Sequence, residues 1–173
     1  MSYRLSCLAL AAGLLVSACS KSTTSPTTTA APPKFTATLL PANEVPAITN
    51  ADAAATGTAT ITLNVTKDAA GNVTAATADF AVTLAGFPAN TTLTGAHIHT
   101  GAAGATGGIL VNTGLANGEV VLANGTGGIN KLGITVDPAV AQAIINGPSG
   151  YYFNVHTSLN TGGAARAQLV RAN

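Results

Sequence analysis

The three histidines of this chain are the residues best suited to chemistry. They lie in two short runs, His97-Ile98-His99 and Asn154-Val155-His156-Thr157. Neutral imidazole binds both copper and zinc, and a His-x-His pair with a third histidine is a reasonable ligand set for either ion. Because only 8% of the residues are charged, few other side chains could supply such chemistry. His97, His99 and His156 are therefore the candidate metal ligands.

Strand periodicity predicts where these imidazoles point. Successive side chains of a β-strand face opposite sides, so His97 and His99 share one face if the apolar Ile98 faces the core. In the second run the apolar alternation falls on Tyr151, Phe153 and Val155, which leaves Tyr152, Asn154 and His156 on the other face. We expect all three imidazoles to point away from the core and, if their strands are neighbours, to form one surface patch.

A structural role is the alternative for the same residues. In the last strand Arg166 and Gln168 alternate with alanines and should face outward beside Asn154 and His156. A fixed guanidinium would repel a bound cation unless an acid neutralises it, and Glu44 is a candidate for that acid. Glu44, Asn154, Arg166 and Gln168 thus define a possible structural polar network, in which the histidines hold loops onto the sheet by hydrogen bonds. Both interpretations stay open at this point.

The rest of the chain reads as short antiparallel strands. Residues 58–66 alternate apolar and threonine or asparagine positions, and a turn at residues 67–72 leads to a second alternating run. The expected strands are residues 35–40, 58–66, 78–84, 93–99, 109–112, 119–122, 151–157 and 165–171. One helix is expected near residues 137–146, with Asp137 as its cap and Gly147 at its end. The fold class is all-β, an antiparallel, Greek-key-like sandwich of seven or eight strands.

Composition excludes several functions. The formal net charge of the 173 residues is +1, without a basic stripe, so binding of nucleic acid is not expected. The serines form no nucleophile elbow, and no carboxylate pair stands in a recognisable arrangement. The glycine-rich residues 101–108 lack the Lys-Ser/Thr ending of a phosphate-binding loop. We therefore expect no enzymatic activity, with a metal-dependent oxidoreductase as the remote exception.

The N-terminus has the features of an export signal. Arg4 precedes an apolar run at residues 8–16 that is too short to span a bilayer. Residues 15–19, Leu-Val-Ser-Ala-Cys, resemble a bacterial lipobox, which implies a signal peptide at residues 1–18 and a lipid on Cys19. An ordinary secreted protein cut near Ala18 is the alternative. Ser20 stands where an inner-membrane retention signal usually has Asp, so the outer membrane is favoured. Residues 19–34 are rich in Ser, Thr and Pro and are expected to form a flexible tether.

Several motifs together resemble one family. They are the run Pro-Ala-Asn-Glu-Val-Pro at residues 41–46, Gly-Ala-His-Ile-His at residues 95–99, Tyr-x-Asn-Val-His-Thr at residues 152–157, and Gly-Gly-x-x-Arg-x-Gln-Leu at residues 162–169. In this order they resemble the CHRD domain, named after chordin and common in exported bacterial proteins. The resemblance covers about residues 35–170 and implies a β-sandwich, but no settled activity. The family usually has Glu where this chain has Ala164, which removes one possible partner of Arg166.

A second, shorter resemblance concerns His97-Ile98-His99. This strand is similar to the copper-binding strand of copper/zinc superoxide dismutases, which are also β-sandwiches. A dismutase site uses six histidines and an aspartate, whereas this chain has three histidines. Dismutase activity is therefore not expected, although a site for a single metal ion is compatible with the residues.

These observations lead to two functional hypotheses. The first is a lipid-anchored protein of the cell envelope with one domain at residues 35–171, acting as a non-enzymatic binding or structural module. The second is a periplasmic copper- or zinc-binding protein that uses His97, His99 and His156. In both, the expected partner is the membrane, through the lipid on Cys19, and the expected state is a monomer.

The lipid anchor can be tested by metabolic labelling. Cells expressing the chain should incorporate a labelled fatty acid into it, and Cys19→Ala should abolish the label because the acceptor thiol is lost. Cys7→Ala is the matched control and should keep the label, since Cys7 leaves with the signal peptide. Label on the Cys19→Ala protein, or none on the wild type, would contradict the assignment.

Overall fold

The computed structural model describes residues 31–173, which form one compact unit, Ala31–Asn173. The expected signal peptide, Cys19 and most of the expected tether lie outside the described residues. None of the described helices is long and apolar enough to cross a membrane.

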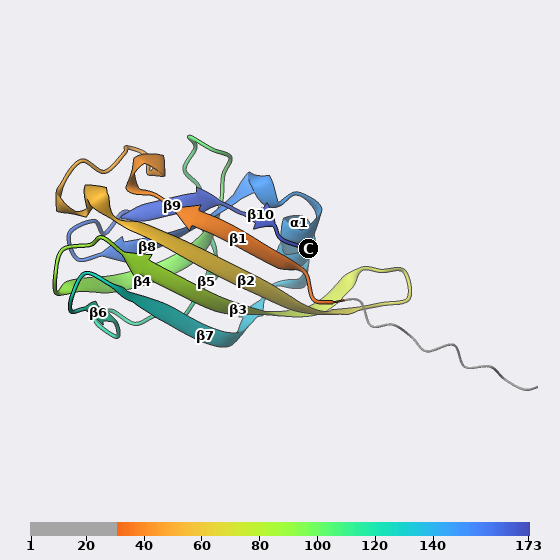
Figure 1. Ribbon diagram of the computed structural model, residues 1–173. Helices are drawn as coiled ribbons and strands as arrows, with labels where there is room; N and C mark the ends of the chain where they lie inside the picture. The colour runs from red at the N-terminus through yellow and green to blue at the C-terminus, as the bar shows by residue number, and fades with distance from the viewer. Residues whose placement is uncertain (1–30) are drawn as a thin grey trace, which may run out of the picture. The chain divides into compact units, whose positions relative to one another are not determined.

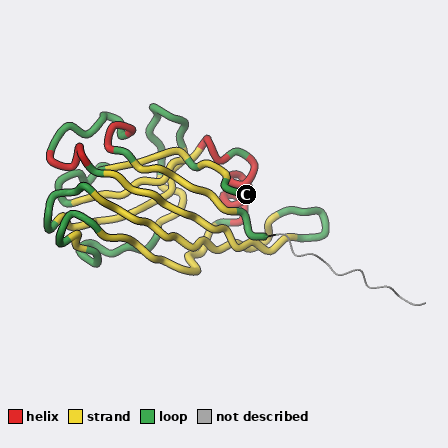
Figure 2. Tube along the Cα trace, in the orientation of Figure 1, coloured by secondary structure: helices red, strands yellow, loops and turns green. Residues whose placement is uncertain are grey.

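The described residues fold into two antiparallel sheets. Sheet A has the order β10-β1-β2-β3-β7, where these strands are Val170–Arg171, Lys34–Leu39, Thr56–Lys67, Val73–Ala85 and Gly127–Val136. Sheet B has the order β5-β4-β8-β9, where these strands are Ile109–Asn112, Thr91–Thr100, Tyr151–Thr157 and Ala165–Gln168. A short strand, β6 (Val121–Leu122), pairs with the start of β4. Figure 1 shows the two sheets as layers, and Figure 2 shows the loops that connect the strands. The expected all-β sandwich is confirmed.

The core lies between the two sheets. It consists of the apolar side chains that alternate along each strand and face inward. Ile61 of β2 and Phe80 of β3 are fully buried, as are Ile98 and Phe153 of sheet B. The rings of Phe80 and Phe153 stack across the layers with centroids 5.8 Å apart. Removal of this apolar surface from water is the main term that holds the layers together.

The helix forms as expected at α1 (Pro138–Asn146). The carboxylate of Asp137 accepts hydrogen bonds from the backbone N–H groups of Ala139 and Val140, which satisfies donors that the first turn leaves free. Ala141 and Ile144 are its buried residues, and they pack the helix against one end of the sandwich. Three 3-10 turns, η1 (Pro41–Asn43), η2 (Ala51–Ala54) and η3 (Pro148–Gly150), complete the helical elements of residues 31–173.

The strand count expected from the sequence is wrong, because residues 31–173 contain ten strands. Strand β7 was not expected, since Gly127-Gly128 opens it and an irregularity near Lys131–Gly133 interrupts its alternation. The last expected strand, residues 165–171, divides at Leu169 into β9 of sheet B and β10 of sheet A. The strand expected at residues 119–122 is reduced to β6. The chain passes from one sheet to the other at Leu169, whose side chain is buried.

The aromatic stack predicts a large effect of one substitution. Phe153→Ala should lower the free energy of unfolding by about 3–5 kcal/mol, because it leaves a cavity between the layers. Chemical denaturation monitored by circular dichroism measures this change. Leu132→Ala, at a residue that is 69% exposed, is the control and should change stability by less than about 0.5 kcal/mol. Equal effects of the two substitutions would contradict this description of the core.

Candidate functional site

The outer face of sheet B carries the candidate residues in a regular grid. His97, Asn154 and Arg166 lie opposite one another on β4, β8 and β9. His99, Tyr152 and Gln168 form the next row, and Gly95 lies opposite His156. Ile98 and Val155 are fully buried in the core behind this face, so the strand alternation orients the imidazoles as the sequence predicts. We call this set of polar side chains the outer-face cluster.

The expected surface patch is nevertheless wrong, because loops cover this face. His99 and His156 are only 7% and 8% exposed, and Asn154 and Arg166 are each 2% exposed. The coverage comes from η1 and its flank, from residues 101–108 and from residues 158–163, whose backbone carbonyls contact the cluster. His97 is half-buried and remains the solvent side of the cluster. Buried polar groups must find hydrogen-bond partners, so the loop carbonyls are part of the site.

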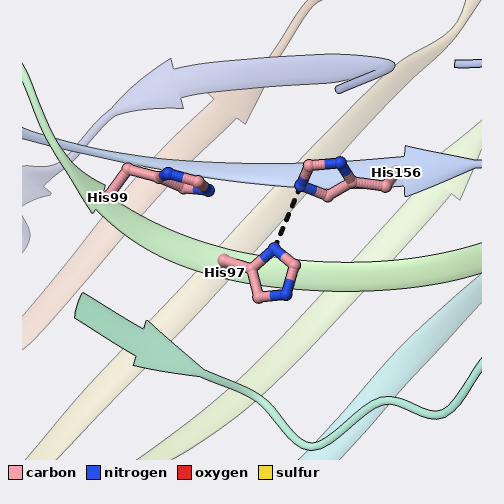
Figure 3. Close-up of side chains that lie close together, drawn as sticks. All are labelled: His97, His99 and His156. Atoms are coloured by element: carbon pink, nitrogen blue, oxygen red, sulfur yellow. Dashed lines mark hydrogen bonds between the residues drawn. The ribbon is translucent and has the colours of Figure 1, made fainter. Parts of the chain in front are cut away.

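The three imidazoles converge (Figure 3). One ring nitrogen from each of His97, His99 and His156 lies within 4.8 Å of the others. Nδ1 of His97 and Nε2 of His156 lie 3.0 Å apart. The ring centroid of His97 lies 5.6 Å from that of His99 and 4.8 Å from that of His156, and both ring pairs are arranged edge to face. The sequence therefore identified three residues that the fold brings together.

Two loop carbonyls determine the tautomers of two of these rings. Nδ1–H of His99 donates to the carbonyl of Gly107 at 3.0 Å, and Nδ1–H of His156 donates to the carbonyl of Thr161 at 2.9 Å. A carbonyl only accepts, so in each neutral ring Nε2 keeps its lone pair. Nε2 of His156 lies 3.0 Å from Nδ1 of His97, whose N–H can donate to this lone pair, and 3.1 Å from the amide oxygen of Asn154, which cannot. Nε2 of His99 is buried and has no partner.

Two of the imidazoles, those of His97 and His156, are held neutral. Burial, and then the neighbouring rings of His156 and His99, lower the pKa of His97 to about 4. Burial also lowers the pKa of His156, although its bond to the Thr161 carbonyl acts in the opposite direction. Three adjacent rings cannot all carry a positive charge without mutual repulsion. At neutral pH these two rings therefore hold lone pairs that need no deprotonation before they bind a cation.

Gly95 makes the position of His97 possible. A Cβ atom built on Gly95 would lie 2.9 Å from Cε1 and 3.3 Å from Nε2 of His97, so the imidazole occupies the space that a side chain would need. This packing lets His97 reach His156, which lies opposite Gly95 on β8. Gly95 belongs to the Gly-Ala-His-Ile-His motif at residues 95–99, but the sequence did not predict a structural role for it. A glycine inside a strand is a signal of close approach by a neighbouring group.

Arg166 and His99 each contact the ring of Tyr152. The guanidinium carbon of Arg166 sits 4.4 Å from the centroid of the Tyr152 ring, and His99 stacks on that ring at 4.8 Å with an angle of 4°. Because β4 and β9 flank β8 on opposite sides, the ring of Tyr152 separates the cation from His99. Nε and Nη1 of Arg166 donate to the carbonyls of Asn43 and Ala105. Tyr152 had no role assigned from the sequence, and its aromatic ring is what spaces these two groups.

The other residues of the expected polar network also reach this face. Gln168 donates from Nε2 to the carbonyls of Gly101, Ser149 and Tyr151. Glu44 is buried, and desolvation raises the pKa of its carboxyl to about 7, although Arg166 and a hydrogen bond from Asn154 act to lower it. Gly163 gives this carboxyl its space, since a Cβ there would lie 2.8 Å from both of its oxygens. Glu44 therefore lies close to the cluster, without a salt bridge to Arg166.

Comparison with known proteins gives one match. The family model of the CHRD domain matches residues 35–169. No curated protein and no solved structure matches this chain. The resemblance to the CHRD domain drawn from the sequence is confirmed, whereas the likeness of the His97 strand to superoxide dismutases stays an expectation.

The packing of Gly95 predicts the effect of adding one methyl group. Gly95→Ala should displace the ring of His97 and separate it from His156, so the pKa of His97 should rise from about 4 toward its ordinary value. Titration of the imidazole resonances by NMR measures this shift. Gly108→Ala is the control, because a Cβ there meets nothing within 4 Å. A titration of His97 that is unchanged by Gly95→Ala would contradict the assigned role.

Proposed function

The chain belongs to the CHRD domain family, and we propose that it is a lipid-anchored, non-enzymatic protein of the bacterial envelope that binds one copper or zinc ion. The ligands are His97, His99 and His156. The ion sits on the outer face of sheet B, beneath the loops that cover the outer-face cluster. This proposal unites the two hypotheses drawn from the sequence, because the metal site gives the binding module its ligand.

The unpartnered Nε2 of His99 is the observation that carries the proposal. Its ring is 7% exposed, its Nδ1–H is used by the Gly107 carbonyl, and its Nε2 has no hydrogen-bond partner. A buried acceptor without a partner costs roughly 1–3 kcal/mol. A metal ion bound to this lone pair would remove that cost, and two further imidazoles each have a nitrogen within 4.8 Å of a nitrogen of His99 and could share the ion.

The geometry requires only local adjustment to hold an ion. Nitrogen ligands at about 2.0–2.1 Å from a tetrahedral ion lie about 3.3 Å from one another. The 3.0 Å between His97 Nδ1 and His156 Nε2 is already in this range. The widest separation, up to 4.8 Å, closes by small side-chain rotations. Coordination through Nδ1 of His97 would require the proton of that ring to move to its Nε2, the other neutral tautomer, and the ion would then replace the hydrogen bond between His97 and His156.

The surroundings of the rings favour a metal. Ligating histidines usually donate their second ring N–H to a carbonyl or carboxylate, which orients the ring, and His99 and His156 both do so. The charge of Arg166 is separated from His99 by the ring of Tyr152.

A structural polar network is the second candidate function for the same residues. It is favoured by the hydrogen bond between His97 and His156, which needs no metal. It leaves Nε2 of His99 unexplained. A tetrahedral metal ion with three protein ligands keeps one coordination position free for a substrate. The metal-bound protein would therefore also be compatible with oxidoreductase activity.

Calorimetric titration of the metal-free mature chain distinguishes these functions. We expect one Cu²⁺ or Zn²⁺ per chain, with copper tighter than zinc as the Irving–Williams order requires. His99→Ala should weaken binding by at least about 100-fold, because it removes one of three ligands together with the hydrogen bond that its ring makes to the Gly107 carbonyl. Asn130→Ala, on the outer face of the other sheet, is the control and should bind normally.

Binding should also stabilise the fold, by about 2.7 kcal/mol when the free ion is at 100 times its Kd. His99→Ala should lose this stabilisation while keeping the circular dichroism spectrum of the wild type. If neither ion binds more tightly than about 10 μM, or if His99→Ala binds as the wild type does, the metal function is wrong and the structural network is supported.

A further inference from the structure

A cavity of about 600 Å³ opens beside the outer-face cluster. It lies between η1 and its flank, residues 101–108 and strand β9. Among the described residues that line it, Glu44 and Arg166 carry the only ionisable side chains. Val45 and Val170, which are 43% and 60% exposed, give it apolar walls. The volume suits a small organic molecule, since ligand sites commonly span about 300–1,000 Å³.

Arg166 brings a buried positive charge to this cavity without a counter-ion. It is 2% exposed, and Nη2 of its guanidinium has no hydrogen-bond partner. Within residues 31–173 the one salt bridge is Lys131–Glu119, which does not involve Arg166. Two backbone carbonyls accept from Nε and Nη1, which satisfies donors but supplies no negative charge. A buried, unpaired charge is costly, so this position favours an anion.

Glu44 only partly neutralises the charge of Arg166. Its carboxyl lies outside salt-bridge distance of Arg166, and one of its oxygens is buried without a partner. Burial raises its pKa to about 7, so a large share of the molecules carry a neutral, hydrogen-bond-donating carboxylic acid at neutral pH. Glu44 and Arg166 both line the cavity, and a protonated carboxyl and a guanidinium are both hydrogen-bond donors.

We propose that this cavity binds a small organic carboxylate, with Arg166 as its anchor and the protonated carboxyl of Glu44 as a second donor. Guanidinium matches a carboxylate in charge and in planar geometry. The apolar walls at Val45 and Val170 take the hydrocarbon part. This site does not depend on the metal function, because none of the three histidines lines the cavity.

The test is calorimetric titration of the mature chain, with a chelator present, using butyrate and its neutral isostere butyramide. We expect butyrate to bind with a Kd of millimolar order or tighter and butyramide to bind at least tenfold more weakly. Inorganic phosphate is the third probe. If phosphate binds as tightly as butyrate, the anchor recognises anions in general and the assignment to carboxylates is wrong.

Three variants locate the site. Arg166→Met should abolish butyrate binding, and Glu44→Gln, which keeps an N–H donor and removes the negative charge, should bind butyrate several-fold more tightly at pH 8. Since Arg166→Met removes a buried anchor and could unfold the protein, Ala103→Phe is used as well. Ala103 is exposed at the cavity, so the larger ring should block entry without disturbing the core.

Ala70→Phe, at an exposed turn residue between β2 and β3, is the matched control and should bind butyrate as the wild type does. Equal binding of butyrate and butyramide would overturn the proposal. So would a folded Ala103→Phe protein with unchanged affinity for butyrate.

Discussion

The burial of the outer face of sheet B is the constraint on which the rest of this structure depends. Sheet A leaves its outer face exposed or half-exposed, with threonines at alternate positions of β2. Sheet B instead has loops over its outer face, and polar residues such as Asn154 and Arg166 are almost fully buried there. In such a place each donor and acceptor must be matched, and each charge compensated, because water no longer does so.

The loops meet most of this demand with backbone carbonyls. The carbonyls of Gly107 and Thr161 orient two imidazoles, and those of Asn43 and Ala105 hold Arg166. This close approach of backbone and side chains requires the absence of a Cβ. At Gly107 an added Cβ would collide with the carbonyl of Thr100. The glycines of this domain are therefore part of how its polar face is built.

Some buried side-chain atoms make no hydrogen bond to the loop carbonyls or to any other group. Four buried side-chain atoms of residues 31–173 have no hydrogen-bond partner, and three of them belong to this face: Nε2 of His99, Oε1 of Glu44 and Nη2 of Arg166. The first belongs to an imidazole that lies beside two others. The other two belong to residues that line a cavity. A metal ion would bind the lone pair of His99, and a carboxylate would accept hydrogen bonds from Arg166 and protonated Glu44. These two sites are neighbouring but separate.

Much of this arrangement could be predicted from the sequence. Period-2 alternation correctly placed Ile98 and Val155 in the core and the three histidines on the other face, and the motif order identified the CHRD domain, hence the sandwich. The burial of that face could not be predicted, because it comes from loops whose sequence carries no periodicity. Strand β7 was missed for a related reason, since glycines and an irregularity hide its alternation. The role of Tyr152 as a spacer required the register of three strands.

The most direct test of the central claim is long-range ¹H–¹⁵N NMR of the imidazole rings, before and after addition of one equivalent of Zn²⁺. In the metal-free protein, His99 and His156 should show protonated Nδ1 and unprotonated Nε2. Zinc should then shift the ¹⁵N resonances of Nε2 in His99, Nε2 in His156 and Nδ1 in His97 together. If these three resonances do not move at saturating zinc, the histidines do not share an ion and the account of this face as a metal site is wrong.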